Sequence, residues 1–277
     1  MDRTKDQSYL LIVDGILISG MIAFLYYGNL KWLWGRWMEN PDYSHGPLIP
    51  LISLFIVYQK RNQIREIDVR GSIIGIYFIL LAVLIYIVSM RAQVNFALSY
   101  SLIVLLCGIV LFLGGKQLFF KLAFPICFLF FMVPFWTGAI IKLSNALKVL
   151  SSIATHGIVD LLGYPVFRDG VVLYMSKGTL EVADPCSGIR SLIALLALGS
   201  VMAYYSNTHI AKKVILVALA IPIAFIGNTL RIVFFAVVLE NKGVIITEGP
   251  LHTLSGMAVF AFALAVLILS SKWMSRA

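Results

Sequence analysis

Long apolar stretches separated by short polar segments dominate the pattern of hydrophobic and polar positions along the chain. A helix needs about 20 consecutive, mostly apolar residues to cross the hydrocarbon core of a bilayer. Eight stretches approach this length, approximately residues 9–27, 46–58, 72–90, 96–113, 118–136, 189–205, 214–239 and 253–271. The pattern predicts an all-α polytopic membrane protein with about eight transmembrane helices.

Three of these stretches depart from an uninterrupted apolar helix. Residues 46–58 are few for a span, so we expect this helix either to begin within the preceding loop or to tilt little. The stretch 214–239 contains Pro222 together with Asn228 and Arg231, which predicts either a kink or a segment lined with polar groups. Asp14, in the first stretch, requires a polar partner inside the bundle that the sequence does not identify.

The polar segment from residue 137 to residue 185 contains two further predicted elements. Apolar residues recur in it at roughly helical spacing, namely Ile140, Leu143, Leu147, Leu150 and Ile158. This spacing predicts an amphipathic helix that lies along the outer membrane surface. The following run, VFRDGVVLYMSKGTLEV, alternates β-branched and aromatic residues around two glycine-containing turns. It predicts a small β-hairpin that leads into Asp184.

The composition agrees with a membrane protein and argues against other classes. The chain of 277 residues is 60% hydrophobic and only 13% charged, whereas soluble domains average about 25% charged residues. The net charge of +9 would suggest a nucleic-acid partner for a soluble protein. In a membrane protein it is the expected excess of Lys and Arg, so we expect no nucleic acid. The three cysteines have no disulfide or zinc spacing, and neither a metal nor a cofactor is expected.

The distribution of basic residues predicts the orientation, because cytoplasmic loops are enriched in Lys and Arg. With a cytoplasmic N-terminus, twelve basic residues lie in inner loops and tails: Arg3, Lys5, Lys60, Arg61, Arg65, Arg70, Lys116, Lys121, Lys212, Lys213, Lys272 and Arg276. The outer side holds eight, half of them in the one long segment, where the rule counts less. Both termini are therefore predicted to be cytoplasmic.

Three reactive side chains share the outer end of the bundle in this topology. Cys186 begins the sixth span, His252 begins the eighth, and Arg231 lies about 27 Å along its helix from Lys213. A helix start favours thiolate, because its free N–H groups and its dipole stabilise negative charge. An imidazole can take the proton of a thiol, and a fixed cation can stabilise an oxyanion or bind a carboxylate. The set predicts a cysteine nucleophile with a base and a cation.

Each member of the set also has a structural explanation when it is taken alone. Cys107 and Cys127 lie in the middle of spans, as small apolar residues do, and Cys186 alone could be a third packing residue. An arginine at the end of a span commonly extends its charge to the interface, which suffices to explain Arg190. Convergence at one depth is what favours a functional role for the set.

Five further residues are candidates for substrate-binding or supporting roles: Asp184, Ser187, Gly188, Asn228 and His45. The first three flank Cys186, and Asn228 lies one turn from Arg231 on the same helix face. His45, in DYSHGP, is on the outer side and either lines the same cavity or shapes a turn. A zinc site can also be drawn from the histidines and Cys186, but no two of these residues share a ligand spacing.

The segments that carry these residues resemble the signature regions of a known family. CSGIRSL (186–192), NTLRI (228–232) and HTLSGM (252–257) are similar to the three signature regions of the exosortase/archaeosortase family. DYSHGPLIPLISLFIVYQKR (42–61) resembles the exosortase N-terminal region. The similarity covers nearly the whole chain, which we expect to form a single domain over residues 1–277. Family members often have glutamate shortly before the cysteine, whereas Asp184-Pro185 stand here.

The resemblance implies a membrane cysteine protease or transpeptidase of a prokaryotic inner membrane, with its site on the outer, periplasmic side. The family's catalytic cysteine, arginine and histidine correspond to Cys186, Arg231 and His252. The implied partners are membrane lipid, an amine-bearing cell-surface acceptor, and the C-terminal sorting-signal peptides of exported proteins. Such a signal has a Pro-Glu-Pro motif, an apolar span and a basic tail. The sequence leaves open whether water or the acceptor resolves the thioester.

A carrier or flippase is the alternative from a different class of protein. Arg231 and the basic outer rim would then hold an anionic lipid or a polysaccharide precursor, and Cys186 would be a packing residue. The sequence shows no inverted repeat and a single interrupted span, which disfavours a carrier. A purely structural scaffold has no use for three polar groups at one depth.

Overall fold

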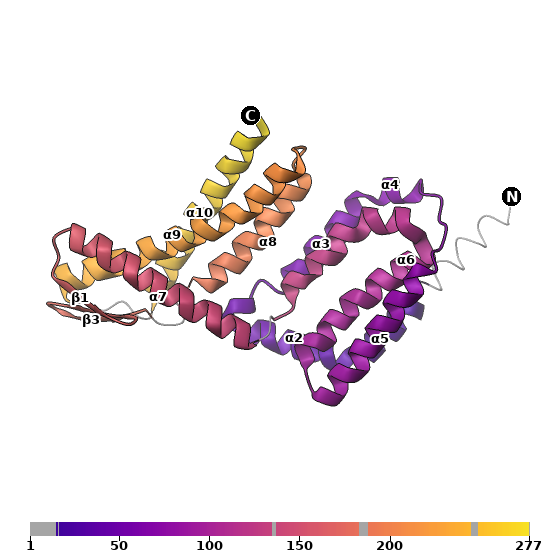
Figure 1. Cartoon of the computed structure of the whole chain (residues 1–277), viewed down its shortest axis with the longest axis horizontal. Helices are drawn as coiled ribbons and strands as arrows, with labels where there is room; N and C mark the ends of the chain where they lie inside the picture. The colour runs from indigo at the N-terminus through magenta and orange to yellow at the C-terminus, as the bar shows by residue number, and fades with distance from the viewer. Residues whose placement is uncertain (1–14, 16, 135–136, 183–187, 245–248, 277) are drawn as a thin grey trace. The chain divides into compact units, whose positions relative to one another are not determined.

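The structure is a computed structural model that describes residues 15, 17–134, 137–182, 188–244 and 249–276. The chain divides into two compact units, Met1–Pro134 and Phe135–Ala277. Helices make up most of both units, and the second unit also contains a small sheet (Figure 1). The predicted fold class, a helical membrane protein with a small β element, agrees with these units.

The first unit consists of helices of very different lengths. Residues 17–25 are helical, and the following elements are α2 (Tyr27–Glu39), η1 (Pro41–Tyr43), α3 (Leu48–Gln59), α4 (Arg61–Arg65), α5 (Ile74–Ala92), α6 (Asn95–Phe128) and η2 (Leu129–Met132). The predicted stretch 46–58 corresponds to α3, which begins at Leu48 and not within the preceding loop, and whose 12 residues are too few to cross a bilayer. The predicted stretch 9–27 lies partly outside the described residues, and Asp14 lies outside them altogether.

Glycines allow α5 and α6 to approach each other closely. Gly75 packs on the backbone of α6, where a Cβ would lie 2.6 Å from the Gly108 carbonyl oxygen. Small residues at helix interfaces permit such backbone contact, which matters in a membrane because apolar burial between helices contributes little there. Gly115, with φ of 74°, interrupts α6, and a Cβ at this position would overlap the Arg70 carbonyl oxygen. This break takes the place of the loop predicted between residues 113 and 118.

Buried polar side chains of the first unit satisfy one another across helices. The Tyr26 hydroxyl and Ser101 Oγ form a hydrogen bond of 2.9 Å. Asn29 Nδ2 donates to the Asn95 carbonyl oxygen at 3.0 Å, and Ser99 Oγ donates to Asn29 Oδ1 at 3.0 Å. Unsatisfied polar groups are costly in an apolar surrounding. These pairs therefore fix α2 and its preceding turn against the N-terminal part of α6.

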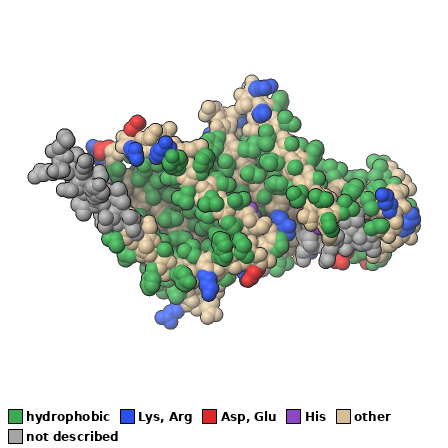
Figure 2. Space-filling model, turned by 180° about the vertical axis from the view of Figure 1, so that it is seen from behind, with side chains coloured by type: hydrophobic (Ala, Val, Ile, Leu, Met, Phe, Trp, Pro, Cys, Tyr) green, Lys and Arg blue, Asp and Glu red, His purple; other side chains and the backbone are tan. Residues whose placement is uncertain are grey.

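Among the described residues, four helices are long and apolar enough to cross a membrane: α5, α6 with η2 (Asn95–Met132), α9 (Ile210–Lys242) and α10 (Pro250–Arg276). The helix α8 (Ile189–Tyr205) is apolar but shorter. Many large hydrophobic side chains are exposed, and Figure 2 shows hydrophobic side chains spread widely over one face, as contact with lipid requires. These helices support an integral membrane protein. The eight predicted spans are not confirmed, in part because the fourth and fifth form one element broken at Gly115.

The predicted surface helix is present in the second unit as α7 (Thr137–Leu161). Its residues Ser151, Ser152 and Thr155 are buried, whereas Leu150 and Ile153 are exposed. The helix therefore turns small polar residues towards its own unit and apolar residues outward. An outward apolar face is compatible with a helix that lies against the apolar part of the membrane surface.

The predicted hairpin is part of a larger sheet. Three antiparallel strands, β1 (Val166–Asp169), β2 (Val172–Met175) and β3 (Gly178–Glu181), lie in the order β1-β2-β3. Leu173 of β2 and Leu180 of β3 are buried in an apolar cluster with Ile232 and Phe235 of α9. Both predicted glycine-containing turns therefore form, and the second one adds a third strand.

The helix α9 is the centre of the second unit, because α7, α8, α10 and the sheet all contact it (Figure 1). It is helical from Ile210 to Lys242, through Pro222. Of the two predicted features, the polar lining is present, since Asn228 and Thr229 are buried within the unit. On its other faces, Leu216 and Ala220 pack in an apolar cluster with α8 and α10.

Candidate active site

The residue at the centre of the predicted site, Cys186, lies outside the described residues, as do Asp184 and Ser187. The residues on either side of this segment are described. Val182, which follows β3, is buried in the cluster on α9, and Gly188 caps the start of α8. The segment that carries the cysteine therefore connects the end of the sheet to the N-terminus of α8.

Gly188 brings the start of α8 into contact with Asn228 of α9. Its φ of 76° lies in the left-handed region, which favours glycine. A Cβ on Gly188 would lie 3.0 Å from Asn228 Cγ. Asn228 Nδ2 also donates to Ser151 Oγ of α7 at 3.5 Å, and the three residues line a cavity of about 10 Å³. This volume is close to the minimum for one water. Asn228 therefore links the start of α8 to α7.

Arg231 lies opposite a glycine of α10. A Cβ on Gly256 would be 3.2 Å from Arg231 Nη1, so the guanidinium occupies the space that a side chain at position 256 would need. One turn earlier in α9, a Cβ on Gly227 would be 3.0 Å from Val259 Cγ1. Two glycines, one on each helix, thus make room for their neighbours at successive turns of the same interface.

His252, in the first turn of α10, stacks on a phenylalanine of α9. The ring centroids of His252 and Phe235 are 5.5 Å apart, and the ring planes differ by 26°. Phe235 is buried, and so is His252 Nδ1, which makes no hydrogen bond within the part of the chain that the structure describes. Stacking on a buried ring restricts the orientation of the imidazole, as a general base requires.

These contacts form a regular series along the two helices, the α9–α10 ladder: Gly227–Val259, Arg231–Gly256 and Phe235–His252. Residues three or four apart share a helix face, and four residues advance about 6 Å along the axis. Arg231 and His252 therefore belong to neighbouring contact pairs of the series. A guanidinium and an imidazole so placed can stabilise an anion and transfer a proton.

His45 belongs to the first unit, in the turn that precedes α3. Both of its ring nitrogens are buried, and its ring centroid lies 6.5 Å from that of Tyr43. Burial lowers the pKa of the His45 imidazole below its ordinary value, while the Phe131 backbone and the Asp42 carboxylate oppose this shift. Both roles that the sequence left open for His45, lining a cavity or shaping a turn, therefore stay predictions.

Metal ligands do not gather in the described part of the chain, where no group of three His, Cys, Asp or Glu side chains is positioned to hold an ion. The ladder brings together a guanidinium and an imidazole, two groups that can take part in catalysis. They suit acid–base and electrostatic catalysis with a nucleophile.

Sequence reasoning missed three residues that support this site. Phe235 and Gly256 contact His252 and Arg231, and Ser151 bonds to Asn228. Phe235 lies four residues after Arg231, and Gly256 lies four after His252, so each shares a helix face with a predicted site residue. That spacing was the available signal. Nothing in the local sequence of α7 distinguishes Ser151 from its neighbouring serine.

Comparison with known proteins identifies the family. The sequence matches the family model described as transmembrane exosortase over residues 37–269, which is most of the chain. The matched range contains Cys186, Arg231 and His252. No curated protein and no solved structure matches the chain. Exosortases are membrane proteases or transpeptidases with a general role in processing sorting signals. The extent of the match shows that the chain belongs to the transmembrane exosortase family.

Proposed function

We propose that this exosortase is a membrane cysteine protease/transpeptidase, one domain over residues 1–277, that cleaves C-terminal sorting signals of exported proteins. The proposed signal has a Pro-Glu-Pro motif, an apolar span and a basic tail. The observation that carries the proposal is the α9–α10 ladder. It holds the guanidinium of Arg231 and the imidazole of His252 on adjacent turns, and α9 also contacts the helix that begins just after Cys186.

The proposed reaction begins with the Cys186 thiol. Its proton passes to His252, and the thiolate attacks the scissile carbonyl carbon. The carbonyl π electrons move to oxygen, and Arg231 stabilises the resulting oxyanion through directed N–H groups. When the tetrahedral intermediate collapses, the C–N bond breaks and the leaving amine takes the proton from His252. The products are a Cys186 thioester and the released apolar span.

The thioester is then resolved by a second nucleophile. Water would give hydrolysis, and an amine-bearing acceptor at the cell surface would give transfer. In either case His252 takes a proton from the incoming group, and the thiolate leaves as the new C–O or C–N bond forms. His252 then returns the proton to the thiolate, which restores the starting thiol. The scheme consists of proton transfers and acyl transfers, for which the three side chains suffice.

Asn228 has a supporting role in this proposal. It contacts Gly188 and donates to Ser151, so it holds the start of α8 in place two residues after the nucleophile. Asp184, Ser187 and Gly188 complete the segment around the thiol. Accurate placement of a nucleophile matters, because a displacement of about 1 Å can reduce rates about 100-fold.

Trapping the thioester tests the proposed function. Membranes that contain the enzyme and a tagged sorting-signal substrate, quenched in acid, should yield an enzyme adduct of the N-terminal fragment. Hydroxylamine should release the fragment, because it cleaves thioesters under conditions that spare amides. Cys186→Ala membranes are the control and should form no adduct. Cleavage without a hydroxylamine-sensitive adduct would contradict covalent catalysis by the cysteine.

We propose that the site faces the outer, periplasmic side of the inner membrane. Twelve basic residues are assigned to the inner side and eight to the outer side, and cytoplasmic loops are the ones enriched in Lys and Arg. A substrate anchored by its own C-terminal span presents its cleavage site at that interface. A membrane-impermeant maleimide should label Cys186 in intact spheroplasts and leave Cys107 unlabelled. Labelling of Cys186 that requires broken membranes would reverse the proposed orientation.

Gly256→Ala should slow sorting-signal cleavage about tenfold without reducing insertion into the membrane. The new Cβ would lie 3.2 Å from Arg231 Nη1, so the guanidinium must move by a few tenths of an ångström. Pulse-chase of a tagged substrate measures the rate. Gly157→Ala is the matched control, because a Cβ on this helical glycine of α7 meets no atom within 4 Å. Equal rates for the two variants would mean that the position of Arg231 is unimportant.

A further inference from the structure

The sheet in the second unit has an outer strand that comes shortly before the proposed nucleophile in the sequence. The strand β3 is an outer strand, and among the described residues β2 is its one hydrogen-bonded neighbour. Glu181 ends β3, and Cys186 follows five residues later in the sequence. The outer strand β3 therefore comes directly before the segment of the chain that carries the proposed nucleophile.

The register determines which backbone groups point out of this edge. Val182 N–H donates to the Val171 carbonyl oxygen at 2.9 Å, and hydrogen-bonded pairs alternate along antiparallel strands. Leu180 therefore also bonds to β2, while the backbone groups of Thr179 and Glu181 point away from it. The side chains of Thr179 and Glu181 are exposed. Within the described part of the chain, the N–H and C=O groups of these two residues have no strand partner on this side and are available to an extended partner.

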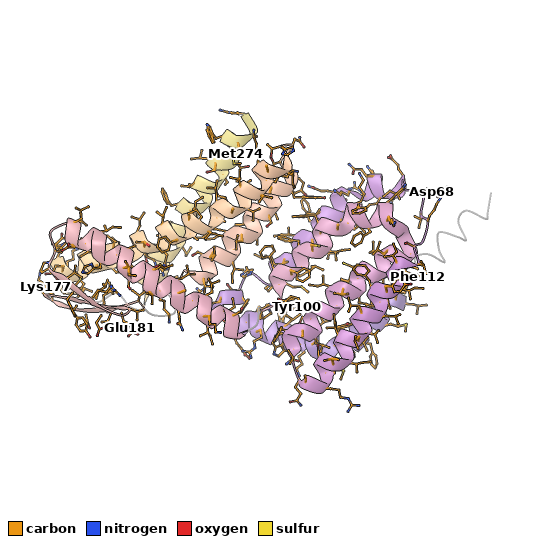
Figure 3. All side chains as sticks on the ribbon, in the orientation of Figure 1. Asp68, Tyr100, Phe112, Lys177, Glu181 and Met274 are labelled. Atoms are coloured by element: carbon orange, nitrogen blue, oxygen red, sulfur yellow. The ribbon has the colours of Figure 1, made fainter. Side chains whose placement is uncertain are left out.

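The strand is held in place on its other sides. Leu180 is buried in the apolar cluster on α9, and at the preceding turn Lys177 Nζ donates to the Asn241 carbonyl oxygen at 2.9 Å. Figure 3 shows Lys177 at the turn and Glu181 near the other end of β3. A preorganised edge loses little conformational entropy when a peptide binds to it.

We propose that the sorting-signal peptide binds as a fourth strand of this sheet, parallel to β3, with its motif beside Thr179 and Glu181. This inference rests on the proposed function, because the occupant is the peptide that is cleaved. The motif precedes the apolar span in the signal. A peptide parallel to β3 therefore runs from the motif towards the segment that carries Cys186. Main-chain hydrogen bonds are the usual source of affinity when a peptide adds to a sheet edge.

The Pro-Glu-Pro motif has a backbone suited to this edge. Proline has no N–H, so it is tolerated in an edge strand where its backbone faces away from the partner. In a parallel pair, one residue bonds through both its N–H and its C=O to two residues of the neighbouring strand. The motif's Glu would donate to the Thr179 carbonyl oxygen and accept from the Glu181 N–H. Both prolines would then face outward, where no N–H is needed.

Proline substitutions on the two edges of the sheet test the inference. Glu181→Pro removes the N–H that would bond to the peptide and should slow cleavage about tenfold or more, because it leaves a peptide carbonyl unsatisfied. Arg168→Pro is the matched control. Hydrogen-bonded residues alternate along β1 as they do along β3, so Asp169 and Phe167 bond to β2 and Arg168 does not. The Arg168 N–H therefore points out of the other edge of the sheet, on β1. Cleavage by Arg168→Pro should stay within about twofold of wild type.

A chemical change in the substrate provides an independent test. A synthetic sorting-signal peptide with N-methylated Glu loses the N–H of that residue and keeps its side-chain charge. It should be cleaved about tenfold more slowly than the unmodified peptide. The control peptide is N-methylated three residues before the Glu, where the N–H would face outward, and it should be cleaved normally.

The outcomes separate this inference from the proposed function. Equal cleavage of the two methylated peptides, or equal activity of the Glu181→Pro and Arg168→Pro enzymes, would overturn the fourth strand while cysteine-dependent cleavage stands. If the Glu181→Pro enzyme does not insert into the membrane, the comparison of the two methylated peptides tests the inference by itself. Failure of the wild-type enzyme to cleave the unmodified peptide would overturn the proposed function and this inference with it.

Discussion

Cys186→Ser is expected to slow sorting-signal cleavage by at least about 10³-fold, with expression and membrane insertion unchanged. Serine differs from cysteine by one atom and fits the same space. Its hydroxyl is far less acidic than a thiol, so a neighbouring imidazole would not ionise it as it would ionise sulfur. Pulse-chase of a tagged substrate, followed by the loss of its precursor band, measures the rate.

The other two cysteines provide the controls for this experiment. Cys107 is partly buried and Cys127 is exposed, and both lie in α6, in the other compact unit. Cys107→Ser and Cys127→Ser should therefore process substrate nearly normally. A similar loss in all three variants would indicate that the thiols contribute to packing, and the carrier alternative would then regain support.

Arg231→Lys should reduce cleavage at least about 100-fold while the protein still folds and inserts. Lysine keeps the positive charge and the apolar stem, so it would replace an arginine whose task is to reach the interface. It lacks the planar pair of directed N–H groups that can bind an oxyanion or a carboxylate. Loss of a single oxyanion donor reduces turnover about 10²–10³-fold in enzymes where it has been removed.

Arg190→Lys is the matched control, because Arg190 is exposed near the start of α8. Its substitution should have a mild effect in the same pulse-chase assay. If Arg231→Lys retained near-wild-type cleavage, the arginine would leave the catalytic set, and Cys186 and His252 would remain as a dyad.

The apolar pattern predicted the long helices of the protein well. The predicted stretch 72–90 agrees with α5 to within about two residues, and the stretch 253–271 lies inside α10. The agreement is close because membrane thickness leaves few alternatives for such long apolar runs. The pattern did not predict that α6 continues to Gly115 and resumes directly after it. At that break a Cβ on residue 115 would overlap the Arg70 carbonyl oxygen, and no local signal in the sequence reveals how close this other segment lies.

The sequence named the members of the candidate site, which stay a prediction, and it could not give the contacts that the described members make. Spacing along one helix shows that Arg231 and Phe235 share a face. It does not show which face of α10 meets them, because that depends on the rotation and offset of a second helix. The pairing of Arg231 with Gly256 and of Phe235 with His252 therefore required the structure.

The α9–α10 ladder also constrains how sequences of this kind can change in length. One residue inserted inside a helix rotates everything beyond it by about 100° and advances it by about 1.5 Å. An insertion between Gly227 and Phe235, or between His252 and Val259, would turn part of the ladder out of the interface. An insertion in the connection between α9 and α10 would leave all three contact pairs in place. Insertions and deletions among relatives should therefore fall in that connection and be absent from the two paired segments.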